Sequence, residues 1–365
     1  MKVFFKELKQ NILLYLALFL LFSNYMLFTA FDWGGEDSFT FFKNIIRIIS
    51  LFLLFLYVGQ VGKIKYSIFS CFLIVLGLYA INGNDILLNI FFFLIIFACL
   101  FRVKLDNIVV FAFTSYVIYF VLHNFFIFTG ILENSISTFD ERIRNSYGFS
   151  NVNRLGIFYF YFFMLNFYMI AHNNKAFYKK IVFYFFALSS IIYILLSDAR
   201  TSLFLCILIV ILWQLSKFDL FYKLQRFALN FVIFFSAGVS FYLASKGGES
   251  FNEVLSYRPA FFKQYTDLLF ENNISIFFGV PLNEDITVDN SYIIFSGAIG
   301  IVLSFIIYLF SPIISYKKYI PRAYVIMIIA SLLYGVFESN LLRVEMLVPI
   351  FVLFCLFFGK KENFS

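Results

Sequence analysis

Four short polar segments, three of which hold arginines, interrupt a chain that is otherwise dominated by Phe, Leu, Ile and Tyr. The planar guanidinium group binds a phosphate or a carboxylate through two parallel hydrogen bonds, so arginines grouped in this way are typical of an anion-binding site. Asparagine, serine and acidic residues accompany them. The four segments are RNSYGFSNVNRLG at 144–156 (with Arg142 just before it), SDARTS at 197–202, SYRP at 256–259 and VDNSY at 288–292.

Three of these segments end where a long apolar run begins. The runs begin at Arg154, Arg200 and Ser291, and we expect each run to be a helix. The free N–H groups and the partial positive charge at a helix start favour an anion. Arginines added to such helix starts predict a site for a multiply charged anion at one face of a membrane, and a lipid pyrophosphate fits that description.

Each segment, taken alone, also has a purely structural interpretation. Asp198 can cap a helix and pair with Arg200, and Asn151 and Asn153 can be turn residues. For Asp289-Asn290, an ordinary N-cap is the simpler interpretation. The anion-binding interpretation gains weight because several of the segments fall on one predicted side of the membrane.

The composition predicts an all-α, polytopic membrane protein that forms a single domain over residues 1–365. Of the 365 residues 62% are hydrophobic and 13% charged, and the mean hydropathy is +0.90. Apolar runs of about 20 residues match the roughly 30 Å hydrocarbon core of a bilayer. We expect about twelve spans, at 12–31, 44–62, 66–82, 85–101, 107–131, 154–171, 178–196, 200–216, 226–244, 291–314, 322–337 and 343–358.

The charge distribution sets the expected orientation. With the N-terminus in the cytoplasm, the inner loops carry 18 basic and 4 acidic residues, and the outer side carries 10 basic and 17 acidic ones. This follows the positive-inside rule, so the net charge of +7 reflects topology and not a nucleic-acid-binding surface. The outer side then has two long loops, 132–153 and 245–290. In the second loop, Arg258-Pro259 is predicted to open an amphipathic helix.

The basic residues also differ in type between the two sides. Inside, 15 of the 18 are lysines, whereas outside 7 of the 10 are arginines. Arginine on the side where positive charge is disfavoured needs a reason other than topology, which supports the anion site. Arg47 is an exception, since it lies within an apolar run and is expected to snorkel toward the interface. The outer arginines are Arg47, Arg142, Arg144, Arg154, Arg200, Arg258 and Arg343.

Five stretches together resemble the bacterial O-antigen and capsular repeat-unit polymerases (Wzy type). The resemblance covers residues 142–300, and the first 130 residues match only as generic spans. This chain has Val152 where the family often has proline between the two asparagines, which predicts a slightly looser turn. The stretches are GFSNVNRLG at 148–156, SDARTSLF at 197–204, LSYRPAFFKQY at 255–265, FFGVP at 277–281 and DNSYIIFSGAIG at 289–300.

The resemblance implies a glycosyltransferase of the multi-helix GT-C type in the bacterial cytoplasmic membrane, with its active site on the periplasmic or external face. Such an enzyme joins oligosaccharide repeat units carried on undecaprenyl pyrophosphate, next to a flippase and a chain-length regulator. It needs no metal or other cofactor where arginines stabilise the departing pyrophosphate.

The resemblance also implies roles for individual residues. Arg154, Arg200 and Arg258 are expected to hold the pyrophosphate, with Arg142 or Arg144 in support. The acceptor is a sugar hydroxyl, for which a carboxylate base is suitable. The carboxylate candidates are Asp289, Glu253 and Asp198, and the further substrate-binding candidates are Asn151, Asn153, Asn290 and Tyr292.

Two other functions remain open at this point. An O-antigen ligase, which moves glycan from the same carrier to a lipid A core, typically holds a histidine in the large external loop, and 245–290 contains none. A flippase or transporter for lipid-linked sugars is expected to show internal repeats and broken helices near the membrane midplane. The predicted polar segments lie at outer helix ends, which favours the polymerase.

Overall fold

The computed structural model describes residues 11–31, 36–61, 66–139, 142–172, 177–246, 257–281, 288–316 and 320–359. The fold is all-α apart from one short hairpin, which the sequence did not predict. The helices that begin in the first half of the chain are α2 (Ile12–Tyr25), the π-helix η1 (Met26–Ala30), α3 (Glu36–Val61), α4 (Tyr66–Asn82), α5 (Ile86–Leu100), α6 (Leu105–Phe128), α7 (Val152–His172) and α8 (Phe177–Leu196). The helices of the second half are α9 (Arg200–Ser216), α10 (Asp219–Ser245), α12 (Arg258–Phe270), α13 (Asn273–Phe278), α14 (Ser291–Ile299), α15 (Ile301–Tyr316), α16 (Arg322–Tyr334) and α17 (Val348–Phe358).

The apolar helices are consistent with a membrane protein. Within the described residues, five helices are long and apolar enough to cross a membrane, and further apolar helices have 10–17 residues. Each of the twelve predicted runs overlaps a helix, but the bounds differ: α3 begins eight residues before the predicted start of its run, and α17 begins five residues after the start of the run 343–358. The five long segments are Ile12–Ala30, Thr40–Gln60, Leu105–Phe128, Val152–His172 and Asp219–Ser245.

The predicted run 291–314 is broken at Gly300, between α14 and α15. Gly300 has a φ of +86°, and a Cβ atom there would lie 2.4 Å from the carbonyl oxygen of Phe277. Gly279 faces the same junction with a φ of +83°, and its Cβ would lie 2.2 Å from the carbonyl oxygen of Gly297. Asn82 donates to the carbonyls of Phe278 and Ala298. The FFGVP turn is therefore a packing element, in which glycine permits the close approach of two backbones.

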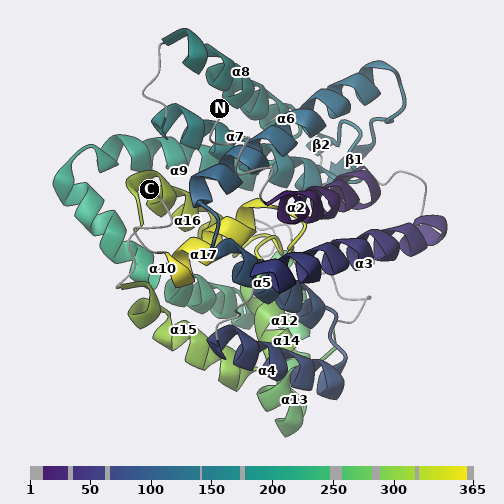
Figure 1. Ribbon diagram of the computed structural model, residues 1–365, viewed down its shortest axis with the longest axis vertical. Coiled ribbons are helices and arrows are strands. Elements are labelled where there is room, and N and C mark those ends of the chain that lie inside the picture. Colours follow the sequence, from purple (N-terminus) through teal and green to yellow (C-terminus); the bar gives the residue numbers. More distant parts are fainter. Residues whose placement is uncertain are drawn as a thin grey trace.

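Helices α16 and α17 lie near the middle of the molecule (Figure 1). They contact α5, α6, α7, α9, α10 and α15. With 13 and 11 residues they are shorter than the roughly 20 residues that cross a bilayer as one helix. The segment 335–347 joins them, and most of its residues are buried although it has no regular secondary structure. Non-helical backbone at the centre of a membrane protein is tolerated where it is buried in protein or lines a polar site.

The first long loop folds into a hairpin, in which β1 (Ile136–Phe139) pairs antiparallel with β2 (Arg142–Asn145). His123 on α6 anchors the end of this loop, since its Nε2 lies 2.6 Å from the carbonyl oxygen of Tyr147. The hydroxyl of Tyr159 on α7 lies 2.8 Å from the other ring nitrogen of His123. Because a carbonyl only accepts, Nε2 carries the proton and Nδ1 accepts from Tyr159. His123 thus ties the hairpin to α6 and α7.

The predicted amphipathic helix of the second loop is confirmed as α12, which begins at Arg258 with Pro259 in its first turn. Proline suits this position because its missing N–H would have no helical partner. Phe262, Tyr265 and Leu269 are buried on one face, which packs against α10, α13 and α14. The helix is therefore docked on the bundle, and this docking fixes the position of Arg258.

Candidate functional site

The buried segment 335–347 receives Arg258 from the start of α12. Arg258 Nη2 lies 2.8 Å from Glu338 Oε1, and Nη1 donates to the carbonyl of Phe337. The side chains are 17% and 6% exposed, so the pair is largely removed from water. A buried charge is tolerated only when it is paired and hydrogen-bonded, and this contact supplies both conditions. The large loop and the α16–α17 connection therefore meet at one ion pair.

The start of α14 is bound to the same segment. Asn290 caps α14 by accepting from the N–H groups of Tyr292 and Ile293, and its Nδ2 donates to the carbonyl of Val336 at 2.7 Å. Ser291 Oγ donates to the carbonyl of Glu338 at 2.7 Å. The structural interpretation of Asn290 as an N-cap is thus confirmed. Its amide also holds 336–338 in place.

Two further predicted site residues, Asp289 and Tyr292, lie next to Asn290 and Ser291 but have different surroundings. Asp289 lies within electrostatic reach of both Arg258 and Glu338, which brings this carboxylate candidate to the ion pair. The Tyr292 hydroxyl donates to the carbonyl of Leu332 at 2.8 Å, and its ring is buried. Tyr292 is therefore part of the packing between α14 and α16.

The opening segment forms the start of α7. Arg154 donates to the carbonyl of Thr29 and to Ser150 Oγ, the latter at 2.6 Å, while its backbone N–H donates to Asn151 Oδ1. Arg144 Nη2 lies 3.3 Å from Asn153 Oδ1, which ties the hairpin to the first turn of the helix. Asn151 and Asn153 thus hold the backbone and Arg144 in position. The side chain of Arg142 and the whole of Glu253 lie outside the described part of the chain.

Helix α9 starts beside α7, at Gly156. A Cβ atom at Gly156 would lie 2.8 Å from Ser202 Oγ and 2.9 Å from Ala199 Cβ, so only glycine fits this crossing without a shift. Ser202 Oγ in turn lies 2.7 Å from the hydroxyl of Tyr334, the last residue of α16. The starts of α7, α9 and α14 are therefore all connected to the α16–α17 region. The N-termini of α12 and α14 contact this region directly, and those of α7 and α9 are linked to it through Ser202 and Tyr334.

Arg200 lies apart from the buried charges. Its Nε donates to Asp198 Oδ1 at 3.1 Å, and its side chain is 67% exposed. The predicted pairing of Arg200 with Asp198 is confirmed. Arg200 thus stands at the exposed rim of α9, and its site role remains a prediction.

Arg47 shows a role that the sequence did not predict. Its Nη2 lies 2.6 Å from Glu345 Oε1, and Glu345 is buried. Arg47 therefore reaches into the protein and pairs, whereas we expected it to snorkel. The hydroxyl of Tyr25, at the end of α2, lies within electrostatic reach of four charged side chains. These are Arg154, Glu338, Arg343 and Glu345.

These contacts define one cluster, which we call the charged chamber. It consists of Tyr25, Arg47, Arg154, Arg258, Asp289, Glu338, Arg343 and Glu345. Burial raises the pKa of Glu338 to about 7, and the charge of Asp289 acts in the same direction. Arg258 and Arg343 oppose the shift, but desolvation of the carboxylate is the larger effect. A carboxyl group with this pKa changes its protonation state near neutral pH.

Backbone strain is found at the same segments. In the part of the chain that the structure describes, three non-glycine residues have a positive φ: Tyr147 at 45°, Asp198 at 55° and Tyr257 at 59°. Each lies shortly before one of the helix starts with Arg154, Arg200 or Arg258. A left-handed conformation is uncommon for a tyrosine and is often found at functional sites. The strained residues therefore lie in the segments that lead into the helices carrying Arg154, Arg200 and Arg258.

The sequence did not point to the acidic members of the chamber on α16–α17. The stretch ESNLLRVE at 338–345 holds Glu338, Asn340, Arg343 and Glu345 between two apolar runs. We read it as a short outer turn between two spans. The lengths of the two apolar runs could have indicated that this stretch is buried, because neither run reaches the roughly 20 residues that cross a bilayer.

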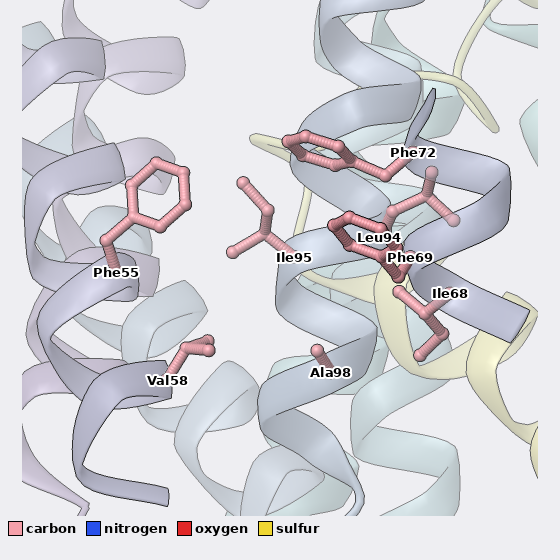
Figure 2. A pocket seen from close by; sticks show the side chains of 8 residues that line it. All are labelled: Phe55, Val58, Ile68, Phe69, Phe72, Leu94, Ile95 and Ala98. Carbon is pink, nitrogen blue, oxygen red and sulfur yellow. The ribbon is translucent and has the colours of Figure 1, made fainter. Parts of the chain in front are cut away.

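An apolar cavity of about 160 Å³ lies among α3, α4 and α5. Figure 2 shows α3 on one side of it and α4 and α5 on the other. All of its lining side chains are apolar: Phe55, Val58, Ile68, Phe69, Phe72, Leu94, Ile95 and Ala98. Arg47 of the chamber lies two to three turns earlier on α3, which places the cavity about 12 Å further along that helix. A cavity with such walls suits hydrocarbon and not water.

The chain was compared with known protein families, curated proteins and solved structures, and none of them matches it.

Proposed function

We propose that the protein is a polymerase that joins oligosaccharide repeat units carried on undecaprenyl pyrophosphate, at the outer face of the bacterial cytoplasmic membrane. The observation that supports it most is that the N-termini of α12 and α14 and several arginines gather around the buried α16–α17 connection, to which α7 and α9 are linked through Ser202 and Tyr334. Helix starts and arginines both favour anions, and a low-polarity setting strengthens each interaction. In this proposal the chamber stabilises the pyrophosphate as it leaves the donor sugar.

The proposal assigns the arginines different parts. Arg154 and Arg258, held by α7 and α12, act on the pyrophosphate, and Arg343 stands beside them. Arg200 acts from the rim, where its exposed side chain is available to a negatively charged headgroup. The proposed fold is the GT-C type with about twelve spans, and a flippase and a chain-length regulator are the proposed partners.

The apolar cavity supports the proposal that the substrate carries a lipid chain. A polyprenyl chain is a hydrocarbon whose headgroup is charged, so its two ends require different surroundings. The charged chamber and the apolar cavity share α3, which carries Arg47 in the chamber and Phe55 and Val58 in the wall of the cavity. One substrate of this class can therefore contact both sites.

A second candidate function is a transporter for lipid-linked sugars. It is favoured by the pair α16 and α17, two short helices with a charged, buried connection, since discontinuous helices of this kind form substrate sites in transporters. An O-antigen ligase has no specific observation of this structure in its favour.

Deletion of the gene, followed by electrophoresis of the surface polysaccharide, separates the candidates. Loss of the long-chain ladder with a single repeat unit retained supports the polymerase. Loss of every repeat unit from the surface supports a transporter, and loss of all capped core supports a ligase. A normal ladder in the deletion strain contradicts all three, and complementation with the intact gene is the control.

A further inference from the structure

Beside the charged chamber lie two buried polar side chains whose hydrogen-bonding capacity is not fully used within the described residues. Asn340 is 0% exposed, and neither atom of its side-chain amide has a hydrogen-bond partner among the described residues. Tyr161 on α7 is equally buried, and the only side chain that offers its hydroxyl a hydrogen bond among the described residues is that of Asn340, without ideal geometry. Buried polar atoms are normally hydrogen-bonded, so each exception requires an explanation.

The two groups face one another and the chamber. The Asn340 amide and the Tyr161 hydroxyl are neighbours, and Tyr161 is within electrostatic reach of Glu338 and Tyr25. Asn340 follows Glu338 by two residues on the same connection. One oxygen of Glu338 is bonded to Arg258, which fixes the position of the carboxylate. A carboxylate, an amide and a phenol therefore converge from α7 and the α16–α17 connection.

This combination is suited to a hydroxyl group. A hydroxyl has one proton to donate and two lone pairs that accept. Glu338 can accept the proton, whereas the amide N–H of Asn340 and the phenol of Tyr161 can donate to the oxygen. Pyrophosphate suits the same position poorly, because it offers acceptors only and cannot donate a hydrogen bond to the Glu338 carboxylate. The arginine side of the chamber and the Asn340 side thus suit the two different partners of a glycosyl transfer.

We propose that Glu338, Asn340 and Tyr161 form the binding site for the acceptor hydroxyl, and that Glu338 is the general base of the reaction. The inference rests on the proposed polymerase function. The hydroxyl oxygen forms a bond to the anomeric carbon of the donor sugar as the bond from that carbon to the pyrophosphate oxygen breaks. The electron pair of the broken bond leaves with the pyrophosphate, and the hydroxyl proton passes to Glu338. This assignment replaces Asp289, Glu253 and Asp198 as the preferred base.

The test uses the full-length protein in phospholipid nanodiscs. The donor is a lipid-linked oligosaccharide, and the acceptor is one repeat unit on an alkyl phosphate, which cannot itself act as a donor. Tyr161→Phe and Asn340→Ala are expected to raise the KM for the acceptor roughly three- to tenfold, the effect of one lost hydrogen bond. The KM for the donor should stay within about twofold. Glu338→Gln is expected to lower kcat at least about 100-fold.

Two variants serve as matched controls. Asn166→Ala removes a buried amide that lies after Tyr161 on α7, and Tyr265→Phe removes a buried hydroxyl on α12. Neither is expected to change the acceptor KM. If Asn340→Ala fails to fold, as judged by its melting temperature, Tyr161→Phe decides the question because it removes one oxygen only.

The outcomes separate this inference from the function on which it rests. No product from the wild-type protein overturns the proposed polymerase. Product from the wild type with an unchanged acceptor KM in Tyr161→Phe overturns the acceptor site, and so does Glu338→Gln that keeps more than about a tenth of the wild-type kcat. In that case the buried amide and hydroxyl serve only to hold internal water.

Discussion

Arg258 and Glu338 are 80 residues apart in the chain, yet their side chains lie 2.8 Å apart in the structure. The contact joins the first residue of α12 to the connection between α16 and α17. Neither residue is held by this contact alone, because α12 packs on α10 and Ser291 binds the backbone of Glu338. The two backbones that carry the pair are therefore each fixed by other contacts. Such rigid support is what a binding or catalytic group requires.

Replacing both partners separates the structural role of this pair from its chemical role. Glu338→Ala or Arg258→Ala leaves a buried charge unpaired, which destabilises a protein by about 3–5 kcal/mol for a fully buried pair. The double variant Arg258→Met with Glu338→Leu is expected to recover most of the melting temperature but no polymer. Arg258→Lys keeps the charge and is still expected to shorten the polysaccharide ladder, because the planar fork is lost. A normal ladder from the double variant would remove the pair from the proposed chemistry.

The proton equilibrium of Glu338 gives a pH dependence of definite sign. Its pKa is raised from 4.5 to about 7 in the folded protein. The folded state therefore binds more protons than the unfolded state between these values, and the free energy of unfolding falls as the pH rises from about 4.5 to about 7. The transfer rate should rise over the upper part of this range, because only the carboxylate accepts a proton. Rate and melting temperature measured from pH 5 to 8 should show opposite trends.

The variant Glu338→Gln is the control for this dependence. It cannot titrate at this position, so the slope of the melting temperature with pH should become smaller. A pH profile of stability that is identical in Glu338→Gln and in the wild type would show that another group is responsible.

Local signals allowed the membrane helices and α12 to be predicted, but not the contacts of the chamber. Runs of apolar residues and the proline after Arg258 act over a few residues, so the sequence displays them. The pairs Arg47–Glu345 and Arg258–Glu338 depend on which helices pack together, and this information is spread over the whole chain. We therefore located Arg154 and Arg258 but treated Arg47 as an isolated side chain.

The Arg47–Glu345 contact should contribute to stability. Arg47→Ala leaves the buried Glu345 without this partner, and a loss of about 1–2 kcal/mol is expected, less than for a fully buried pair because Arg47 is half exposed. Glu345→Gln, alone and combined with Arg47→Ala, completes a double-mutant cycle in melting temperature. A coupling free energy indistinguishable from zero would mean that the two side chains act independently.

Arg200 provides the opposite case, a charge whose removal should affect function but not folding. Its pair with Asp198 is exposed to water, where such pairs contribute about 0–1 kcal/mol. Arg200→Ala should therefore fold normally, while the proposed role at the headgroup predicts that only single repeat units reach the surface. Asp198→Ala is a suitable comparison, because it removes the ion pair but keeps the arginine. If Arg200→Ala produces a full ladder, Arg200 has no part in binding the pyrophosphate.

The crossing of α7 and α9 at Gly156 links packing to function most directly. Gly156→Ala would place a methyl group 2.9 Å from Ala199 Cβ, so one of the two helices must shift, and overpacking of this kind destabilises by about 1–3 kcal/mol. The same shift moves the N-termini of α7 and α9, which carry Arg154 and Arg200, apart, so the ladder should shorten as the melting temperature falls.

Gly59→Ala is the matched control, because nothing lies within 4 Å of the new Cβ on α3. Alanine there should stabilise the helix by up to about 1 kcal/mol and leave the ladder unchanged. Equal effects of the two substitutions would show that the crossing does not depend on the absence of a side chain at Gly156.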